Sequence, residues 1–294
     1  MALASGATLP NGGARLDNEE SLTIVAADGF PLAAVLTRPP ARARAILVIN
    51  SAMGVPHRIY APFARFMAQQ GIVSLRYDYR GISGSAPASL RGFEGSLLDW
   101  AQLDYPSAVA AARREYPDVP LVLLGHSVGG QIFGLDRASL EATALIGVAA
   151  QSGYWRHWDG AGRVGLWSLW HIFIPSLTPT LGFFPASLFG MGENLPRNVA
   201  LQWAACGRHP EYVRNPDWGA KEQHYESIGA PLLSIGMADD FFAPPRSVDA
   251  FRRWFPRSAV TSVTVPTTER LGHFGWFRES QGAPHWRAML DWLK

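Results

Sequence analysis

A serine flanked by glycines follows the apolar run Leu121–Leu124, in the segment LVLLGHSVGG. The apolar run predicts a buried strand, and Ser127 lies at the centre of the pattern G-x-S-x-G that follows it. A serine on a strained turn between a strand and a helix projects its hydroxyl out of the sheet. Glycines are needed beside it, because side chains there would collide with neighbouring backbone. Gly125, Gly129 and Gly130 fit this role, so we predict that Ser127 is a nucleophile, although the five residues alone also suit an ordinary glycine-rich turn.

A serine hydroxyl is a poor nucleophile at neutral pH and needs a base to take its proton. His273 is our candidate, because it lies on the loop between a predicted strand at Val260–Val265 and a predicted final helix at Ala283–Lys294. The seven other histidines lie in the serine turn, before it, in the middle of the chain or in the last helix: His126, His57, His157, His171, His209, His224 and His285.

The base in turn needs a carboxylate that holds its tautomer and stabilises the imidazolium that forms. Asp239 and Asp240 follow a predicted strand at Pro231–Ile235, at its carboxyl end. Two adjacent carboxylates cannot both point at one imidazole, so one of them is the candidate partner. The alternative for the pair is capping of a helix that starts near Arg246.

An acyl-transfer site also needs hydrogen-bond donors for the oxyanion that forms during attack. The backbone N–H of Val128, the residue after the nucleophile, is the first predicted donor. The second should come from the loop Ser51–Pro56, which follows a predicted strand at Ala45–Asn50. Met53 and Ala52 are the candidates within that loop.

The elements that must position these residues alternate between strands and helices. We predict a hairpin from 21 to 37 around Asp28-Gly29, strands at Ala45–Asn50, Ile72–Tyr77, Leu121–Leu124 and Ala144–Ala150, and helices at Ile59–Gln70 and Leu97–Tyr116. Such alternation favours an α/β fold with a mainly parallel sheet covered by helices on both faces.

About 80 residues separate the predicted strands at 144–150 and 231–235, far more than one crossover helix needs. We therefore predict a cap inserted at 152–224, a core formed by 19–151 and 225–294, and a flexible tail at 1–18.

Six of the eleven tryptophans fall in the predicted cap. The run Val164–Phe189 carries no formal charge, yet its prolines and glycines would break a membrane-spanning helix. The aromatic residues could line a pocket over Ser127 or simply pack the cap onto the core. The candidate pocket residues are Trp155, Trp158, Trp167 and Trp170.

Composition excludes several classes of partner. A formal net charge of +2, spread along the chain, gives no electrostatic case for nucleic acid or an anionic membrane. We expect no metal and no cofactor, because no Cys or His spacing suggests zinc and no dinucleotide-binding glycine motif follows a strand. One cysteine excludes an internal disulfide and suits a reducing cytoplasm, and the N-terminus lacks the pattern of a signal peptide. Oligomeric state is not predicted.

Five segments together resemble a little-characterised bacterial branch of the α/β-hydrolase superfamily. They are the serine turn, DYRGI from Asp78, AMGVP from Ala52, SGYW from Ser152 and GHFGWFR from Gly272, and the similarity runs from about Ser21 to Lys294. The resemblance implies the α/β-hydrolase fold and a Ser-His-Asp triad in the chain order serine, acid, histidine.

Within that resemblance, the spacing Asp-x-x-x-Pro to Pro244 favours Asp240 over Asp239. Met53 occupies the place of the residue that follows His-Gly in many lipases, although Ser51-Ala52 stands here instead. The resemblance implies no metal and no organic cofactor.

The leading hypothesis for function is a serine hydrolase that cleaves a carboxylic ester of a small-molecule acyl substrate through an acyl-enzyme. An acyltransferase on the same fold is the second, and a non-catalytic ligand-binding protein is the third. All three triad residue types are present, which argues against the third, because binding alone does not need them. The acyl and leaving groups are not predicted, because a fold does not determine a substrate.

Overall fold

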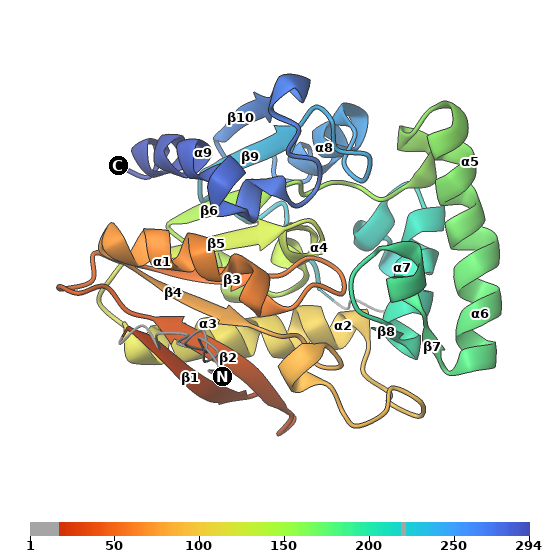
Figure 1. Ribbon diagram of the computed structural model, residues 1–294, viewed down its shortest axis with the longest axis horizontal. Coiled ribbons are helices and arrows are strands. Elements are labelled where there is room, and N and C mark those ends of the chain that lie inside the picture. Colours follow the sequence, from red (N-terminus) through yellow and green to blue (C-terminus); the bar gives the residue numbers. More distant parts are fainter. Residues whose placement is uncertain (1–17, 219–221) are drawn as a thin grey trace, which may run out of the picture.

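The computed structural model describes residues 18–218 and 222–294, so the predicted tail lies outside the described residues apart from Asn18. Eight strands form one sheet in the order β1-β2-β4-β3-β5-β6-β9-β10 (Figure 1). β2 pairs antiparallel with β1 and β4, and all other neighbours are parallel. The strands are β1 (Glu19–Val25), β2 (Pro31–Thr37), β3 (Ala45–Asn50), β4 (Ile72–Tyr77), β5 (Leu121–His126), β6 (Ala144–Val148), β9 (Leu232–Met237) and β10 (Val260–Val265).

Every residue of the five central strands β4, β3, β5, β6 and β9 is buried. Strands covered by helices on both faces are rich in apolar side chains, which explains why they appear as mainly apolar runs in the sequence. β4 also carries the buried polar residues Ser74 and Arg76, and β9 carries Ser234. β10, at the edge, is exposed except at Val265. The predicted α/β fold with a mainly parallel sheet is confirmed, as are the hairpin and the positions of the predicted central strands.

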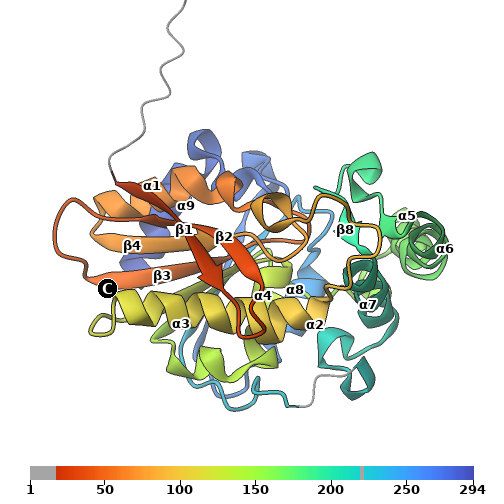
Figure 2. The same ribbon diagram turned by 90° about the horizontal axis from the view of Figure 1, so that it is seen from below.

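Helices cover the two faces of the sheet. α1 (Ala61–Gln69) and α9 (Glu279–Trp292) lie on one face and α3 (Tyr105–Glu115) lies on the other (Figure 2). α3 is preceded by α2 (Leu97–Asp99) and a wider helical turn, so the predicted helix at 97–116 is present. α8 (Pro245–Arg252) follows the loop after β9.

The final helix α9 begins four residues before its predicted start, with Gly282 and Pro284 inside it. Gly282 allows close packing there, because a Cβ at this position would lie 1.9 Å from the carbonyl oxygen of Trp276.

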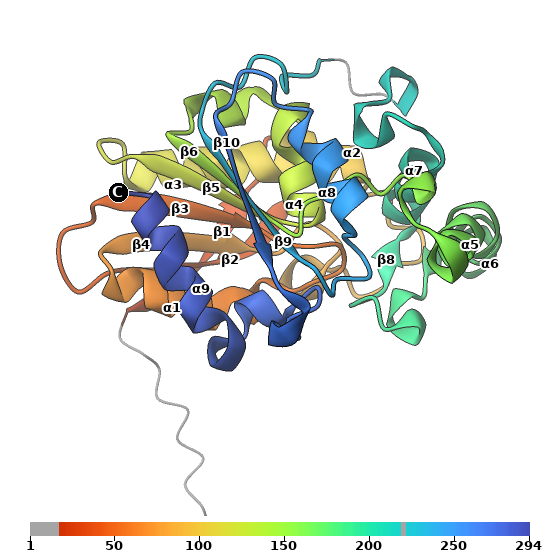
Figure 3. The same cartoon turned by 90° about the horizontal axis from the view of Figure 1, so that it is seen from above.

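The chain between β6 and β9 contains α5 (Gly160–Ser168), α6 (Ile174–Leu181), α7 (Arg197–Arg208) and the short pair β7 (Phe183–Phe184) and β8 (Leu195–Pro196). These elements lie beyond the carboxyl ends of the parallel strands, with α7 nearer the sheet than α5 and α6 (Figures 1 and 3). This arrangement supports the cap that we propose for 152–224. Across residues 18–218 and 222–294, no helix combines the length and apolar character needed to span a bilayer.

Candidate active site

Ser127 lies on a strained turn between β5 and the short helix α4 (Val128–Gln131). Its φ of 53° and ψ of −116° are unfavourable for a residue with a side chain, a cost of roughly 1–3 kcal/mol that the surrounding structure must offset. A Cβ on Gly125 would lie 2.2 Å from the backbone nitrogen of Gly130, and one on Gly129 would lie 2.2 Å from the carbonyl oxygen of Asn50. The two glycines of the motif are therefore required by close backbone packing.

Gln151 is a neighbour of Ser127 that the sequence analysis did not identify. Its Nε2 lies 3.5 Å from Ser127 Oγ and donates to the carbonyl oxygen of Phe242 at 3.0 Å. Its Oε1 accepts from Gln131 Nε2 at 3.0 Å. The side chain thus connects α4 to the loop that carries Asp240. Its place shortly after β6, at the carboxyl ends of the strands where Ser127 also lies, is the signal that could have identified it.

Asp240 and His273 form a direct pair. His273 Nδ1 lies 2.7 Å from Asp240 Oδ2, and the Asp240 side chain is fully buried. Asp240 Oδ1 accepts from the backbone N–H groups of Phe242 and Ala243 at 2.8 and 3.2 Å. Because both carboxylate oxygens are engaged, the carboxylate is held in one orientation. The His273 Nδ1–H donates to it, which leaves Nε2 as the ring nitrogen without this partner.

Asp239 points elsewhere. It is exposed, and its Oδ2 accepts from the backbone N–H of Gly272 at 3.0 Å. Gly272 has a φ of 53° and directly precedes His273. Asp239 therefore braces the histidine loop, while Asp240 contacts the imidazole, and neither carboxylate caps α8 with its side chain.

Ser127 and His273 line the same small cavity, of about 50 Å³. The other lining residues come from the loop after β3, from the two loops that carry Gln151 and the acid, from the cap and from the histidine loop: Ala52, Met53, Gln151, Met191, Trp203, Phe242 and Phe274. The cavity is thus mainly apolar, with the serine, histidine and glutamine as its polar groups.

None of the four tryptophans that we expected at the pocket lines this cavity. Trp170 is buried and its Nε1 donates to the carbonyl oxygen of Gly153, and Trp158 Nε1 donates to that of Phe241. Trp167 is 39% exposed and stacks on His171, and Trp155 packs beside Tyr154 and Arg156.

The tryptophan that reaches the cavity is Trp203 on α7. It packs edge-on against Trp170 at 4.6 Å. The expectation followed the charge-free run 164–189 and its entrance, whereas Trp203 lies outside that run, on a helix that also carries Arg197 and Arg208.

The backbone N–H groups of Val128 and Met53 donate to no protein acceptor in the described part of the chain. The N–H of Ala52, in contrast, donates to the hydroxyl of Tyr60 at 2.9 Å. Val128 is the first residue of α4, where helical N–H groups have no partner within the helix.

A cap loop packs tightly on the loop that carries Met53. The N–H of Glu193 donates to the carbonyl oxygen of Gly54 at 2.7 Å, and a Cβ on Gly192 would lie 2.5 Å from that oxygen. The Glu193 carboxylate accepts from the N–H of Ser83 and from Arg58. The cap and the loop after β3 are therefore joined by main-chain contact next to the cavity.

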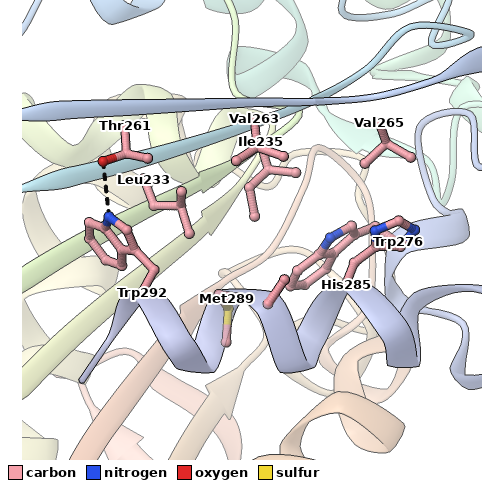
Figure 4. Close-up of a pocket in the computed structure, with 10 residues that line it drawn as sticks. Leu233, Ile235, Thr261, Val263, Val265, Trp276, His285, Met289 and Trp292 are labelled. Atoms are coloured by element: carbon pink, nitrogen blue, oxygen red, sulfur yellow. Dashed lines mark hydrogen bonds between the residues drawn. The ribbon is translucent and has the colours of Figure 1, made fainter.

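Two further cavities differ in their relation to Ser127. A groove of about 480 Å³ shares Phe274 with the Ser127 cavity and is lined by Gly54, Gly192, Glu193 and Arg278 among others. An apolar cavity of about 160 Å³ lies between α9 and strands β9 and β10, where Trp292 Nε1 donates to Thr261 Oγ1 (Figure 4). It shares no lining residue with the Ser127 cavity.

Among the residues described, His, Cys, Asp and Glu side chains form no cluster of three that could bind a metal ion.

Several solved structures with a similar fold are described as lipases, esterases or serine hydrolases. A soluble variant of monoglyceride lipase from Saccharomyces cerevisiae, in complex with a substrate analogue, matches with a TM-score of 0.67 at 14% identity, covering 98% of each chain. A thermostable carboxyl esterase from Bacillus coagulans matches with a TM-score of 0.58 at 16% identity, over 84% of this chain and 90% of its own. A serine hydrolase without a lid from Xanthomonas campestris matches with a TM-score of 0.52 at 18% identity, over 91% and 92%.

The sequence itself matches the family model described as serine aminopeptidase, S33, over residues 41–199, which is more than half of the chain. This segment includes the strand-turn-helix unit around Ser127, and the fold agrees with the α/β-hydrolase resemblance. The protein therefore belongs to the serine aminopeptidase (S33) family of the α/β-hydrolase superfamily, and it is a serine hydrolase by family.

Proposed function

We propose that this protein is a serine esterase that cleaves a carboxylic ester through an acyl-enzyme. Ser127 is the nucleophile, His273 the general base and Asp240 its partner. The single observation that carries the proposal is the cavity shared by Ser127 and His273, with His273 Nδ1 held 2.7 Å from Asp240 Oδ2.

In the proposed reaction, His273 Nε2 takes the proton of Ser127 Oγ while Oγ attacks the ester carbonyl carbon. Asp240 stabilises the imidazolium that results. The tetrahedral intermediate collapses when the imidazolium gives its proton to the leaving alkoxide, which departs as an alcohol and leaves an ester on Ser127. Water then attacks this acyl-enzyme by the same proton transfers and releases the acid and free Ser127.

We propose that the backbone N–H groups of Val128 and Met53 stabilise the oxyanion. Both are free of protein acceptors among the described residues, as oxyanion donors must be. Ala52, the alternative to Met53, is less suited because its N–H already donates to Tyr60.

An ester is favoured over an N-terminal peptide as the substrate. An aminopeptidase must bind a substrate ammonium group, and buried charges need a partner. Within the described chain, the residues that line the Ser127 cavity include no carboxylate. The Glu193 carboxylate in the adjoining groove is already engaged by Ser83 and Arg58.

The cavity dimensions support a short acyl group and a larger alcohol. The Ser127 cavity is about 50 Å³, well below the roughly 300–1,000 Å³ of pockets for drug-sized ligands. The adjoining groove of about 480 Å³ borders Phe274, next to the base that protonates the leaving group. We therefore place the alcohol part of the ester in this groove.

Labelling with a fluorophosphonate probe tests the proposal most directly. The probe reacts with activated serines, so we expect one labelled residue, Ser127, identified by mass mapping of the digested protein. p-Nitrophenyl acetate should be turned over faster than the octanoate. Failure to label Ser127 in folded protein would contradict the proposal.

Shortening Trp203 should shift the acyl-chain preference. Trp203 lines the small cavity, so Trp203→Ala should open space for longer acyl chains. We expect kcat/KM for octanoyl relative to acetyl esters to rise by roughly 10-fold or more, because each buried methylene contributes about 0.8 kcal/mol. The measurement is the kcat/KM profile from acetyl to octanoyl p-nitrophenyl esters, at matched folded fraction.

Trp167→Ala is the matched control, because Trp167 is partly exposed and absent from the cavity. Trp203→Phe repeats the test with a smaller packing loss. An unchanged profile in both Trp203 variants would mean that another residue limits acyl length.

A further inference from the structure

Three hydrogen bonds connect the loop after β3 to the histidine loop through two buried side chains. The N–H of Ala52 donates to Tyr60 Oη at 2.9 Å, and Tyr60 Oη lies 2.9 Å from His126 Nδ1. His126 Nε2 lies 2.9 Å from the backbone carbonyl oxygen of His273. The chain of bonds thus starts one residue before Met53 and ends on the proposed base.

The last of the three hydrogen bonds, from His126 to the His273 carbonyl oxygen, fixes the direction of the other two. A carbonyl oxygen can only accept, so His126 Nε2 must carry the proton. Neutral His126 then accepts at Nδ1 from the Tyr60 hydroxyl, and the Tyr60 oxygen accepts from Ala52. All three donors are satisfied by one arrangement of protons, which fixes the His126 tautomer.

The surroundings of Tyr60 and His126 keep both side chains uncharged and tightly packed. Tyr60 and His126 are both fully buried. Burial lowers the pKa of His126 well below its usual value, with a smaller contribution from His273, and burial raises the pKa of Tyr60. Phe277 packs edge-on against Tyr60 at 4.6 Å and tilted against His126 at 4.8 Å. Neither side chain lines the Ser127 cavity, so neither is placed to contact substrate.

We propose that Tyr60 and His126 are positioning residues that hold the Met53 N–H and the His273 loop at fixed positions relative to Ser127. The proposal rests on the proposed function and deepens it. Because the Ala52 N–H is fixed on Tyr60, the peptide that follows it presents the Met53 N–H to the oxyanion. Because the His273 carbonyl is fixed on His126, the imidazole faces Ser127 from a constant direction.

Tyr60→Phe removes the hydroxyl alone and tests the link. The Ala52 N–H and His126 Nδ1 lose their common partner, so the Met53 peptide can turn. We expect kcat to fall about 10- to 100-fold, as small misplacements of a reacting group do, with KM changed by no more than about twofold. A trifluoromethyl ketone forms an oxyanion on the serine, so its Ki should rise by the same factor by which kcat/KM falls.

Tyr105→Phe is the matched control. Tyr105 is equally buried and its hydroxyl bonds to Ser139, on a different part of the fold. This variant should lose similar stability, measured as Tm, and keep kcat and the ketone Ki within about twofold of the wild type. Equal kinetic losses in the Tyr60 and Tyr105 variants would reduce the role of Tyr60 to general stability and overturn the proposal.

His126 is tested by two replacements that each mimic one ring nitrogen. His126→Gln has an amide near the position of Nε2 that can donate to the His273 carbonyl, whereas His126→Asn extends only as far as Nδ1. We expect the Gln variant to keep more kcat than the Asn variant, at matched folded fraction. Wild-type kcat in Tyr60→Phe, or equal kcat in the Gln and Asn variants, would contradict the link. If Ser127→Ala also kept turnover, the proposed function itself would fail, which separates the two outcomes.

Discussion

Ser127→Ala should reduce ester turnover by roughly 10³-fold or more, because the covalent route through an acyl-enzyme disappears. The fold should persist, since the only protein side chain on Ser127 Oγ in the described residues is Gln151, at 3.5 Å. The measurement is kcat/KM with p-nitrophenyl acetate, together with Tm and the loss of fluorophosphonate labelling.

Ser74→Ala provides the control for removal of a buried hydroxyl. Ser74 is fully buried in β4, and its Oγ has no partner within the described residues. Its variant should keep wild-type turnover. Turnover near the wild-type rate in Ser127→Ala, in a preparation free of contaminating esterase, would refute the assignment of the nucleophile.

Local sequence was enough to predict the serine turn and the central strands. The glycines around Ser127 are specified by contacts within a few residues or with the adjacent strand, and such constraints leave a motif in the chain. Buried strands such as β3 and β5 can be recognised in the sequence by their apolar runs, because both of their faces are covered. The order of serine, acid and histidine then restricted the partners to a few candidates.

Contacts between distant segments could not be predicted in the same way. The bond from His126 to the His273 carbonyl spans 147 positions, and the one from Tyr60 to His126 spans 66. No periodicity encodes such pairs, since they depend on the register of the whole sheet. Trp203 illustrates the same limit in the cap, where a tryptophan's contact with the cavity depends on how α7 packs and not on the apolar character of its neighbours.

Asp240→Asn should lower kcat by about 10³- to 10⁴-fold, as loss of the carboxylate does in other Ser-His-Asp triads. The contacts of Asp240 explain why. Its Oδ1 accepts from the backbone N–H groups of Phe242 and Ala243, so an asparagine would keep its oxygen there and turn its NH₂ group toward His273 Nδ1. Nδ1 would then have to accept, which moves the ring proton to Nε2. A protonated Nε2 cannot take the proton of Ser127.

Asp239→Asn is the matched control, with the same change one residue earlier. Asparagine can still accept from the Gly272 N–H, so the histidine loop should keep its shape and kcat should remain within about 3-fold of the wild type. Both variants are compared by kcat with p-nitrophenyl acetate and by Tm. The reverse order of kinetic losses would transfer the role of acid to Asp239. A large loss in both would mean that the position of Gly272, and hence of the His273 ring, depends on the Asp239 charge as well as on its hydrogen bond.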